Sequence, residues 1–129
     1  MTPWLQNCWY VAGFEPELEQ PFVARRLLGR SVVMLRNAAG ELGALEDRCS
    51  HRFLPLSMGK RVADTMQCGY HGMRFDAKGR CVEVPGQTQV PDRAHVRTYP
   101  LIARDGFLWI WMGDAELADP ALVPDMHWN

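Results

Sequence analysis

Cys49-Ser50-His51 and Cys68-Gly69-Tyr70-His71-Gly72 stand out because each places a cysteine and a histidine within a few residues of each other. The first stretch has the form C-x-H and the second C-x-x-H, and sixteen residues separate them. Each stretch therefore offers one thiolate and one imidazole, two side chains that bind transition metals. We expect the two stretches to be loop tips that hold one metal centre between them.

Two kinds of metal centre use two Cys and two His. A tetrahedral zinc site usually pairs like ligands, as C-x-x-C with a distant H-x-x-x-H, whereas each pair here is mixed. A mixed pair suits a two-iron cluster with unlike ends, in which both thiolates bind one iron and both imidazoles bind the other; this is the Rieske [2Fe–2S] arrangement. We therefore predict that Cys49 and Cys68 bind one iron and that His51 and His71 bind the other.

The residues around these ligands resemble a known family. The runs DRCSHRFLPLSMG at 47–59 and QCGYHGMRFD at 67–76 look like the two cluster loops of the Rieske non-haem iron oxygenases, and NCWYVA at 7–12 is also similar. The pattern resembles the oxygenase component of the vanillate demethylase and dicamba monooxygenase group over nearly the whole chain. Those oxygenases continue into a catalytic domain at least as long as this chain, whereas the sequence here ends at Asn129.

The resemblance implies a function in electron transfer. It implies the Rieske domain of an aromatic-ring-hydroxylating or O-demethylating oxygenase, which takes electrons from a reductase or ferredoxin and passes them to a mononuclear iron. It also implies that His71 is the electron exit, because the outward nitrogen of that histidine in the family contacts a carboxylate in the catalytic domain of a neighbouring subunit. A freestanding Rieske ferredoxin is the alternative, and a structural zinc domain is a third.

The mononuclear iron itself is not expected in this chain. Such an iron needs two His and one carboxylate. Outside the two ligand motifs the chain has only His95 and His127, which are 32 residues apart and do not resemble the close pair of the family. We therefore expect no catalytic residues in this chain alone.

The resemblance also bears on the redox potential. As a family pattern, respiratory Rieske proteins carry an additional Cys in each loop, joined as a disulfide, and a Ser that donates to a bridging sulfide. The corresponding positions here are Leu54, Tyr70 and Met73, so that disulfide and that hydroxyl are missing. Fewer donors stabilise the added negative charge less. We therefore expect a potential near the lower end of the Rieske range, about −150 mV.

Composition sets the remaining bounds. The chain has 129 residues, of which 47% are hydrophobic and 22% charged, as in a single globular domain. A net charge of −1 argues against nucleic acid as a partner. Neither a signal peptide nor an apolar run of roughly 18 residues is visible, so we expect no membrane partner and a cytoplasmic location. Cys8 and Cys81 have no neighbouring His and are predicted to be small buried residues.

Short β-branched and aromatic runs separated by turn signals predict an all-β sandwich or barrel-like fold. The resemblance implies a Rieske-type antiparallel β-sandwich with a small cluster-binding subdomain formed by the two loop tips. The predicted strands cover residues 9–12, 22–28, 31–36, 41–47, 62–67, 73–75, 80–84, 96–103 and 107–112, and 54–61 is predicted to be a loop. We place the Rieske domain at 1–113, with its cluster-binding part at about 47–86. The resemblance implies a loop that covers the cluster at 84–87, and an ordinary turn at these residues is the alternative. Residues 114–129 would be a tail or the start of a linker, in which Asp114 and Asp119 could cap single turns.

Four basic residues flank the ligands, and two interpretations of them stay open. A rim made of Arg52, Lys60, Arg61 and Arg74 could dock an acidic ferredoxin or a ferredoxin-like reductase domain. Alternatively these are ordinary solvated charges, with Arg52 and Arg74 in salt bridges that hold the loops.

Overall fold

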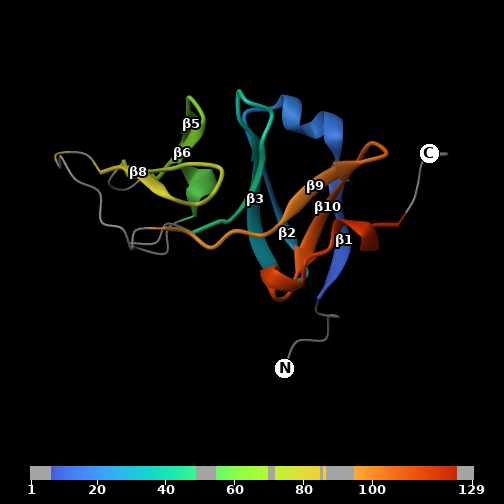
Figure 1. The fold of residues 1–129 in the computed structure, drawn as a ribbon. Helices are drawn as coiled ribbons and strands as arrows, with labels where there is room; N and C mark the ends of the chain where they lie inside the picture. Colours follow the sequence, from blue (N-terminus) through green and yellow to red (C-terminus); the bar gives the residue numbers. More distant parts are fainter. Residues whose placement is uncertain (1–6, 49–54, 70–71, 85, 87–94, 125–129) are drawn as a thin grey trace.

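The computed structural model describes residues 7–48, 55–69, 72–84, 86 and 95–124. In these residues the chain forms three antiparallel sheets and no α-helix (Figure 1). The first sheet has the order β1-β10-β9, the second β2-β3-β4 and the third β5-β6-β7-β8. The strands are β1 Cys8–Phe14, β2 Val23–Leu27, β3 Arg30–Arg36, β4 Leu42–Glu46, β5 Lys60–Val62, β6 Thr65–Gln67, β7 Arg74–Phe75, β8 Cys81–Glu83, β9 Leu101–Arg104 and β10 Phe107–Met112. Four short 3-10 turns accompany them: η1 Glu15–Glu19, η2 Leu56–Met58, η3 Ala115–Leu117 and η4 Pro120–Leu122.

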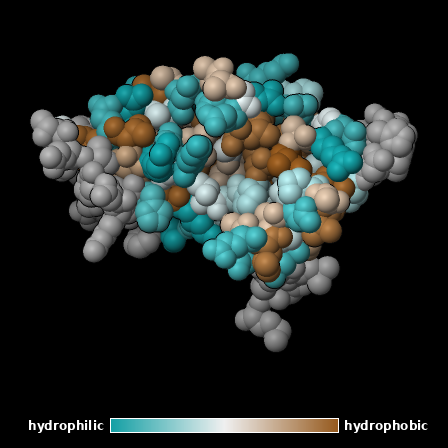
Figure 2. All heavy atoms as spheres, viewed as in Figure 1, coloured by the Kyte–Doolittle hydropathy of each residue, from teal (hydrophilic) through white to brown (hydrophobic). Residues whose placement is uncertain are grey.

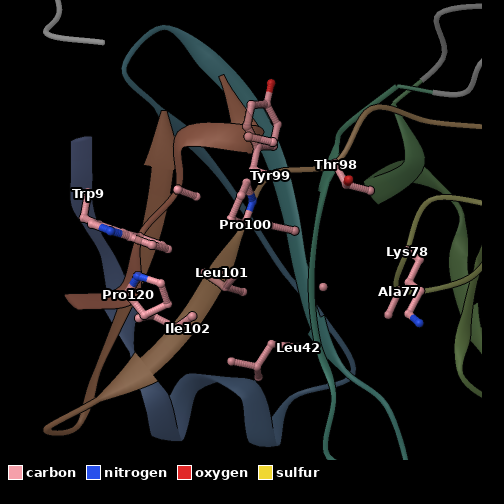
Figure 3. Close-up of a pocket in the computed structure, with 14 residues that line it drawn as sticks. Trp9, Leu42, Ala77, Lys78, Thr98, Tyr99, Pro100, Leu101, Ile102 and Pro120 are labelled. Carbon is pink, nitrogen blue, oxygen red and sulfur yellow. The ribbon is translucent and has the colours of Figure 1, made fainter. Parts of the chain in front are cut away.

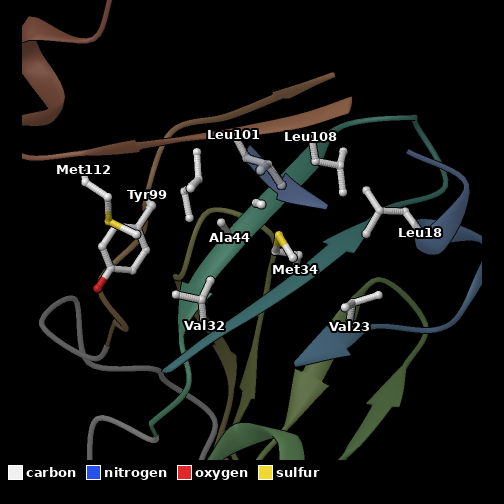
Figure 4. Close-up of a cluster of buried hydrophobic side chains, with 11 residues drawn as sticks. Leu18, Val23, Val32, Met34, Ala44, Tyr99, Leu101, Leu108 and Met112 are labelled. Atoms are coloured by element: carbon white, nitrogen blue, oxygen red, sulfur yellow. The ribbon is translucent and has the colours of Figure 1, made fainter. Parts of the chain in front are cut away.

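One hydrophobic core lies between the first two sheets, which together form the sandwich (Figure 4). Val32 and Met34 of β3 face this core, and Leu108 and Ile110 of β10 face it from the opposite sheet. These four side chains are fully buried. The alternation along β3 is the period of two that a strand imposes on its side chains.

A second core lies on the other face of β3. Val33 and Leu35 point away from the sandwich interior and pack with Leu56, Met66 and Phe75, which belong to the third sheet and to η2. Strand β3 is therefore buried on both faces, which explains its continuous apolar run. The third sheet, which we call the small sheet, lies at one end of the molecule and leans on β3 (Figure 1).

The side chain of Arg61 ties the small sheet to the sandwich. From β5 its guanidinium donates to the Pro21 carbonyl at 2.7 Å and to the Arg36 carbonyl at 2.8 Å. It also donates to the Ala63 carbonyl at 2.8 Å, within the turn that follows β5. These bonds join β5 and its turn to two segments of the sandwich that lie 40 and 25 residues earlier in the chain.

We expect Arg61→Ala to lower the free energy of unfolding by about 2–3 kcal/mol, because three backbone carbonyls lose a charged donor. Urea unfolding followed by tryptophan fluorescence measures this change. Lys60→Ala is the matched control, since the Lys60 side chain is exposed, and it should change stability by less than about 0.5 kcal/mol. Equal effects of the two substitutions would contradict this role of Arg61.

The ion pair between Glu17 of η1 and Arg25 of β2 makes part of the folding stability depend on pH. The Glu17 carboxylate accepts from the Arg25 guanidinium at 2.5 Å and from the Phe14 backbone N–H at 2.7 Å. The hydrogen bond from Arg25, followed by that from Phe14, lowers the pKa of Glu17 below its ordinary value of 4.5. A carboxyl with a lowered pKa in the folded state adds stability above its ordinary pKa, and this stability is lost as the pH falls through the folded-state value.

We therefore expect Glu17→Gln to lower the free energy of unfolding by about 1 kcal/mol or less at pH 7, as is typical of a partly exposed pair. The difference between the variant and the wild type should shrink as the pH is lowered to 3, because the wild-type carboxyl is then increasingly protonated. Thermal melts at the two pH values test this. A difference that stays constant between them would contradict the assignment.

The all-β architecture predicted from the sequence is confirmed, but two details were wrong. Residues 60–67 form the hairpin of β5 and β6 rather than a loop followed by one strand, with Ala63 in the left-handed region at φ 52°. Within residues 96–100 only Thr98 forms an isolated bridge, with Leu45, before β9 begins at Leu101. The predicted caps are confirmed, because the Asp114 and Asp119 side chains accept backbone N–H bonds at 3.0 and 2.9 Å.

Candidate metal centre

Cys68, at the end of β6, is the predicted ligand that the structure describes. Its side chain is buried, and its backbone closes a tight turn from both ends. The Cys68 N–H donates to the Met73 carbonyl at 2.8 Å, and the Gly72 N–H donates to the Cys68 carbonyl at 3.1 Å. Gly72 has φ +73°, a conformation that glycine adopts without strain. The base of the second ligand loop is therefore held by the protein itself.

A hollow of about 410 Å³ opens beside Cys68. Three glycines and the end of β6 contribute to its walls, and Lys60 is the charged residue among those that line it. The lining residues are Met58, Gly59, Lys60, Gln67, Cys68, Gly69 and Gly72. A thiol beside a glycine-lined space, with no carboxylate among these residues, suits a thiolate-bound iron–sulfur cluster, whose sulfurs accept hydrogen bonds from nearby donors. The described residues therefore fit the predicted cofactor.

The base of the first ligand loop is closed by side chains. Asp47 follows β4 directly, and its two carboxylate oxygens accept from the Ser57 N–H at 2.7 Å and from the Ser57 hydroxyl at 2.6 Å. Leu56, beside Ser57, is fully buried in the second core. The ligands Cys49 and His51 of this loop, and His71 of the second, lie outside the described residues.

The bases of the two ligand loops touch at Gly59. A Cβ added to Gly59 would overlap the Gln67 carbonyl oxygen and would lie 3.0 Å from the Gly69 nitrogen. The backbone that leaves the first loop therefore runs directly against the backbone that carries Cys68. No side chain fits between them at this point.

Two members of the predicted basic rim have structural partners. Arg61 binds the backbone carbonyls described above, and Arg74 pairs with Glu83 at 2.6 Å and donates to the Thr65 hydroxyl at 2.9 Å. The loop-holding interpretation of Arg74 therefore agrees with the structure. Lys60 is exposed beside the Cys68 hollow, whereas Arg52 lies outside the described residues.

The two cysteines without a histidine neighbour do not join this site. Cys81 is buried in the second core, and its thiol donates to the Glu83 carbonyl at 3.5 Å. Burial raises the pKa of the Cys81 thiol, so it stays protonated and is a poor metal ligand. Cys8 is half-buried at the start of β1. The prediction of a small buried residue fits Cys81, whereas Cys8 is only half-buried.

A second hollow, of about 470 Å³, lies on the sandwich between β9, the tail and the β7–β8 turn (Figure 3). Its lining is mostly apolar or small, and Lys78 is its charged residue. It therefore offers none of the acid, thiol or imidazole groups that catalysis or metal binding needs. His95 is exposed and takes part in an isolated bridge with Arg80, whereas His127 lies outside the described residues.

The visible surface is mixed. Figure 2 shows hydrophobic atoms in several separate groups among hydrophilic ones on this face of the molecule. Within the described part of the chain, none of the helical segments is long and apolar enough to cross a membrane.

Comparison with protein families identifies the class. The model of the Rieske [2Fe–2S] domain matches residues 8–100, which include both ligand motifs. The chain belongs to the Rieske [2Fe–2S] domain family, and the cofactor of this family is the Rieske-type cluster predicted from the sequence. The resemblance to the vanillate demethylase and dicamba monooxygenase group is also confirmed.

Individual relatives are oxygenase components. The putative toluene-4-sulfonate monooxygenase system iron-sulfur subunit TsaM2 of Comamonas testosteroni is 47% identical over 125 residues, which are 97% of this chain and 36% of that protein. The oxygenase component of dicamba O-demethylase from Stenotrophomonas maltophilia is 43% identical over 122 residues, covering 94% of this chain and 36% of that protein. A crystal structure of dicamba monooxygenase superimposes with a TM-score of 0.90 at 41% identity, over 98% of this chain and 40% of that one. The chain thus spans little more than a third of the length of these relatives.

Proposed function

We propose that this chain transfers single electrons as the Rieske domain of an aromatic-ring-hydroxylating or O-demethylating oxygenase. Cys49 and Cys68 would bind one iron and His51 and His71 the other, and His71 would be the electron exit. A bound Rieske cluster supplies one-electron redox chemistry. The electron donor would be a reductase or ferredoxin, and the acceptor would be a mononuclear iron in an oxygenase catalytic domain or subunit.

The observation that carries this proposal is the pair of preformed loop bases. The Cys68 turn is closed by its own backbone, and the first loop is closed by Asp47 and Ser57, so both ligand loops start from fixed points. The relatives named above are oxygenase components, which supports the oxygenase context over a freestanding ferredoxin.

We propose a Rieske domain at 1–113, with its cluster-binding part at about 47–86, and a tail or linker at 114–129. The capped turns η3 and η4 lie in this tail, and Val123 after them is buried. Of the proposed covering loop at 84–87, residues 85 and 87 lie outside the described residues. Because Arg61 and Arg74 are engaged by structural partners, the docking rim that we propose consists of Lys60 and Arg52.

A redox titration of anaerobically purified protein, followed by electron paramagnetic resonance, tests the proposal. We expect a Rieske-type signal with a potential near the lower end of the range, about −150 mV. A high potential would keep the cluster but contradict the argument from Leu54, Tyr70 and Met73. Zinc in place of iron would contradict the proposed function altogether.

A further inference from the structure

We propose that Asp47 and Ser57 act together as positioning residues for the cluster, by fixing the base of the first ligand loop relative to the second. This inference rests on the proposed ligand set. We call the two residues and the hydrogen bonds between them the Asp47–Ser57 clamp. Neither residue is a predicted ligand, and the clamp acts through the loop that carries Cys49 and His51.

The aspartate end of the clamp is fixed to the sandwich. The Asp47 N–H donates to the Ser31 carbonyl at 2.9 Å, which places Asp47 against β3 two residues before Cys49. On either side of Asp47, the Arg48 and Glu46 side chains pair at 2.6 Å, and the Arg48 N–H donates to the Glu46 carbonyl at 2.7 Å. The carboxylate of Asp47 is therefore presented from a rigid position rather than from a free loop.

The serine end of the clamp is fixed to the second ligand loop. Ser57 lies in η2, between the fully buried Leu56 and the backbone of Met58 and Gly59. Gly59 in turn lies against Gln67 and Gly69, on either side of Cys68. A continuous line of contacts thus runs from two residues before Cys49 to the residues that flank Cys68.

Both oxygens of the Asp47 carboxylate are used on one partner, at 2.7 and 2.6 Å. Hydrogen bonds to an ionised acceptor are stronger than neutral ones, and two bonds to one residue also fix its orientation. Without the clamp, the two ends of the segment between Asp47 and Ser57 would not be held together. Cluster binding would then have to fix their positions, at a cost in conformational entropy. Residues of this supporting kind typically contribute about 10–100-fold to metal affinity.

Cluster loss to a chelator tests the inference. Anaerobically purified wild type, Asp47→Ala, Ser57→Ala, Ser57→Thr and Asp76→Ala are mixed with excess EDTA, and the bleaching of the visible iron–sulfur absorption is timed. We expect bleaching about 10–100-fold faster for Asp47→Ala and a smaller acceleration for Ser57→Ala. Ser57→Thr keeps both donors and should return the rate to that of the wild type.

Asp76→Ala is the matched control. Asp76 likewise accepts several hydrogen bonds, from the Lys78 and Arg80 N–H groups at 2.9 and 3.0 Å and from the Arg80 side chain. Its turn joins β7 to β8 and does not lie between the ligand loops, so its loss should lower thermal stability while leaving the bleaching rate unchanged. Electron paramagnetic resonance of Ser57→Ala and Asp76→Ala adds a second readout, in which only Ser57→Ala should shift the cluster signal.

Each outcome bears on the inference. Wild-type bleaching in Ser57→Ala, or equally fast bleaching in Ser57→Ala and Asp76→Ala, would overturn it while leaving the proposed function intact. If Asp47→Ala does not fold, the comparison of Ser57→Ala with Ser57→Thr still tests the inference. A wild-type protein that holds no iron–sulfur cluster would overturn the proposed function and the inference together.

Discussion

Cys68→Ser should abolish cluster binding, lowering the iron content of the anaerobically purified protein by about tenfold or more. A thiolate ligand is replaced by a hydroxyl that stays protonated at neutral pH, and removing a ligand costs more than removing a residue that only supports one. The readouts are iron and sulfide content, the visible absorption and electron paramagnetic resonance. The Rieske-type signal should disappear along with the iron.

Cys81→Ser is the matched control for this prediction. Both cysteines are buried in the second hydrophobic core, so each substitution places a hydroxyl in the same kind of environment. Cys81 donates to the Glu83 carbonyl, which a serine hydroxyl can also do. We expect Cys81→Ser to keep its iron and its signal. An equal loss of iron in both variants would mean that disturbance of the core, and not ligation, removes the cluster.

Much of this fold follows from local sequence patterns, because its strands are short and its turns carry recognisable residues. The turn at Asn37–Gly40 has Asn first and Gly fourth, and the Asp105-Gly106 turn has the Asp-Gly pair typical of tight hairpins; each connects two paired strands. The β5–β6 hairpin was missed because its turn uses Ala63 and Asp64, and a left-handed alanine is not a turn signal. Pro100 explains the other error, because it has no N–H to continue the predicted strand toward residue 96.

The candidate site also has a part that the sequence predicts and a part that it does not. The ligands are readable because thiolates and imidazoles at fixed spacing have few other uses, but the residues that hold the loops are not. Nothing in the sequence says that Asp47 bonds Ser57, ten residues away, or that Arg61 reaches carbonyls 25 and 40 residues back. These contacts depend on how the small sheet lies on β3, which is a tertiary property. Ser57 and Gly59 belong to the run at 47–59 that resembles the first cluster loop of the family, but the run does not say which residues they contact.

Gly59→Ala should lower the free energy of unfolding by about 3 kcal/mol or more. The added Cβ would overlap the Gln67 carbonyl oxygen, which belongs to the β5–β6 ladder and cannot move without breaking it. For a domain of this size the loss corresponds to a fall of about 10 °C in Tm. Measured on the metal-free protein, the change reports the clash together with the backbone conformation of Gly59, whose φ of −90° and ψ of −138° suit glycine. Measured after reconstitution, cluster content should fall as well, because Gly69 beside Cys68 is displaced.

Gly69→Ala separates this clash from a general intolerance of the second loop. Its Cβ would lie 3.4 Å from the Met58 carbonyl oxygen, an ordinary contact, although Gly69 is closer in sequence to Cys68 than Gly59 is. We expect Gly69→Ala to change the stability of the metal-free protein by less than about 1 kcal/mol. If both variants melted at the wild-type temperature, the two loop bases would have room to separate, and Gly59 could not transmit the position of the first loop to Cys68. A large loss for Gly59→Ala alone would show that the two bases are held in contact before any metal is bound.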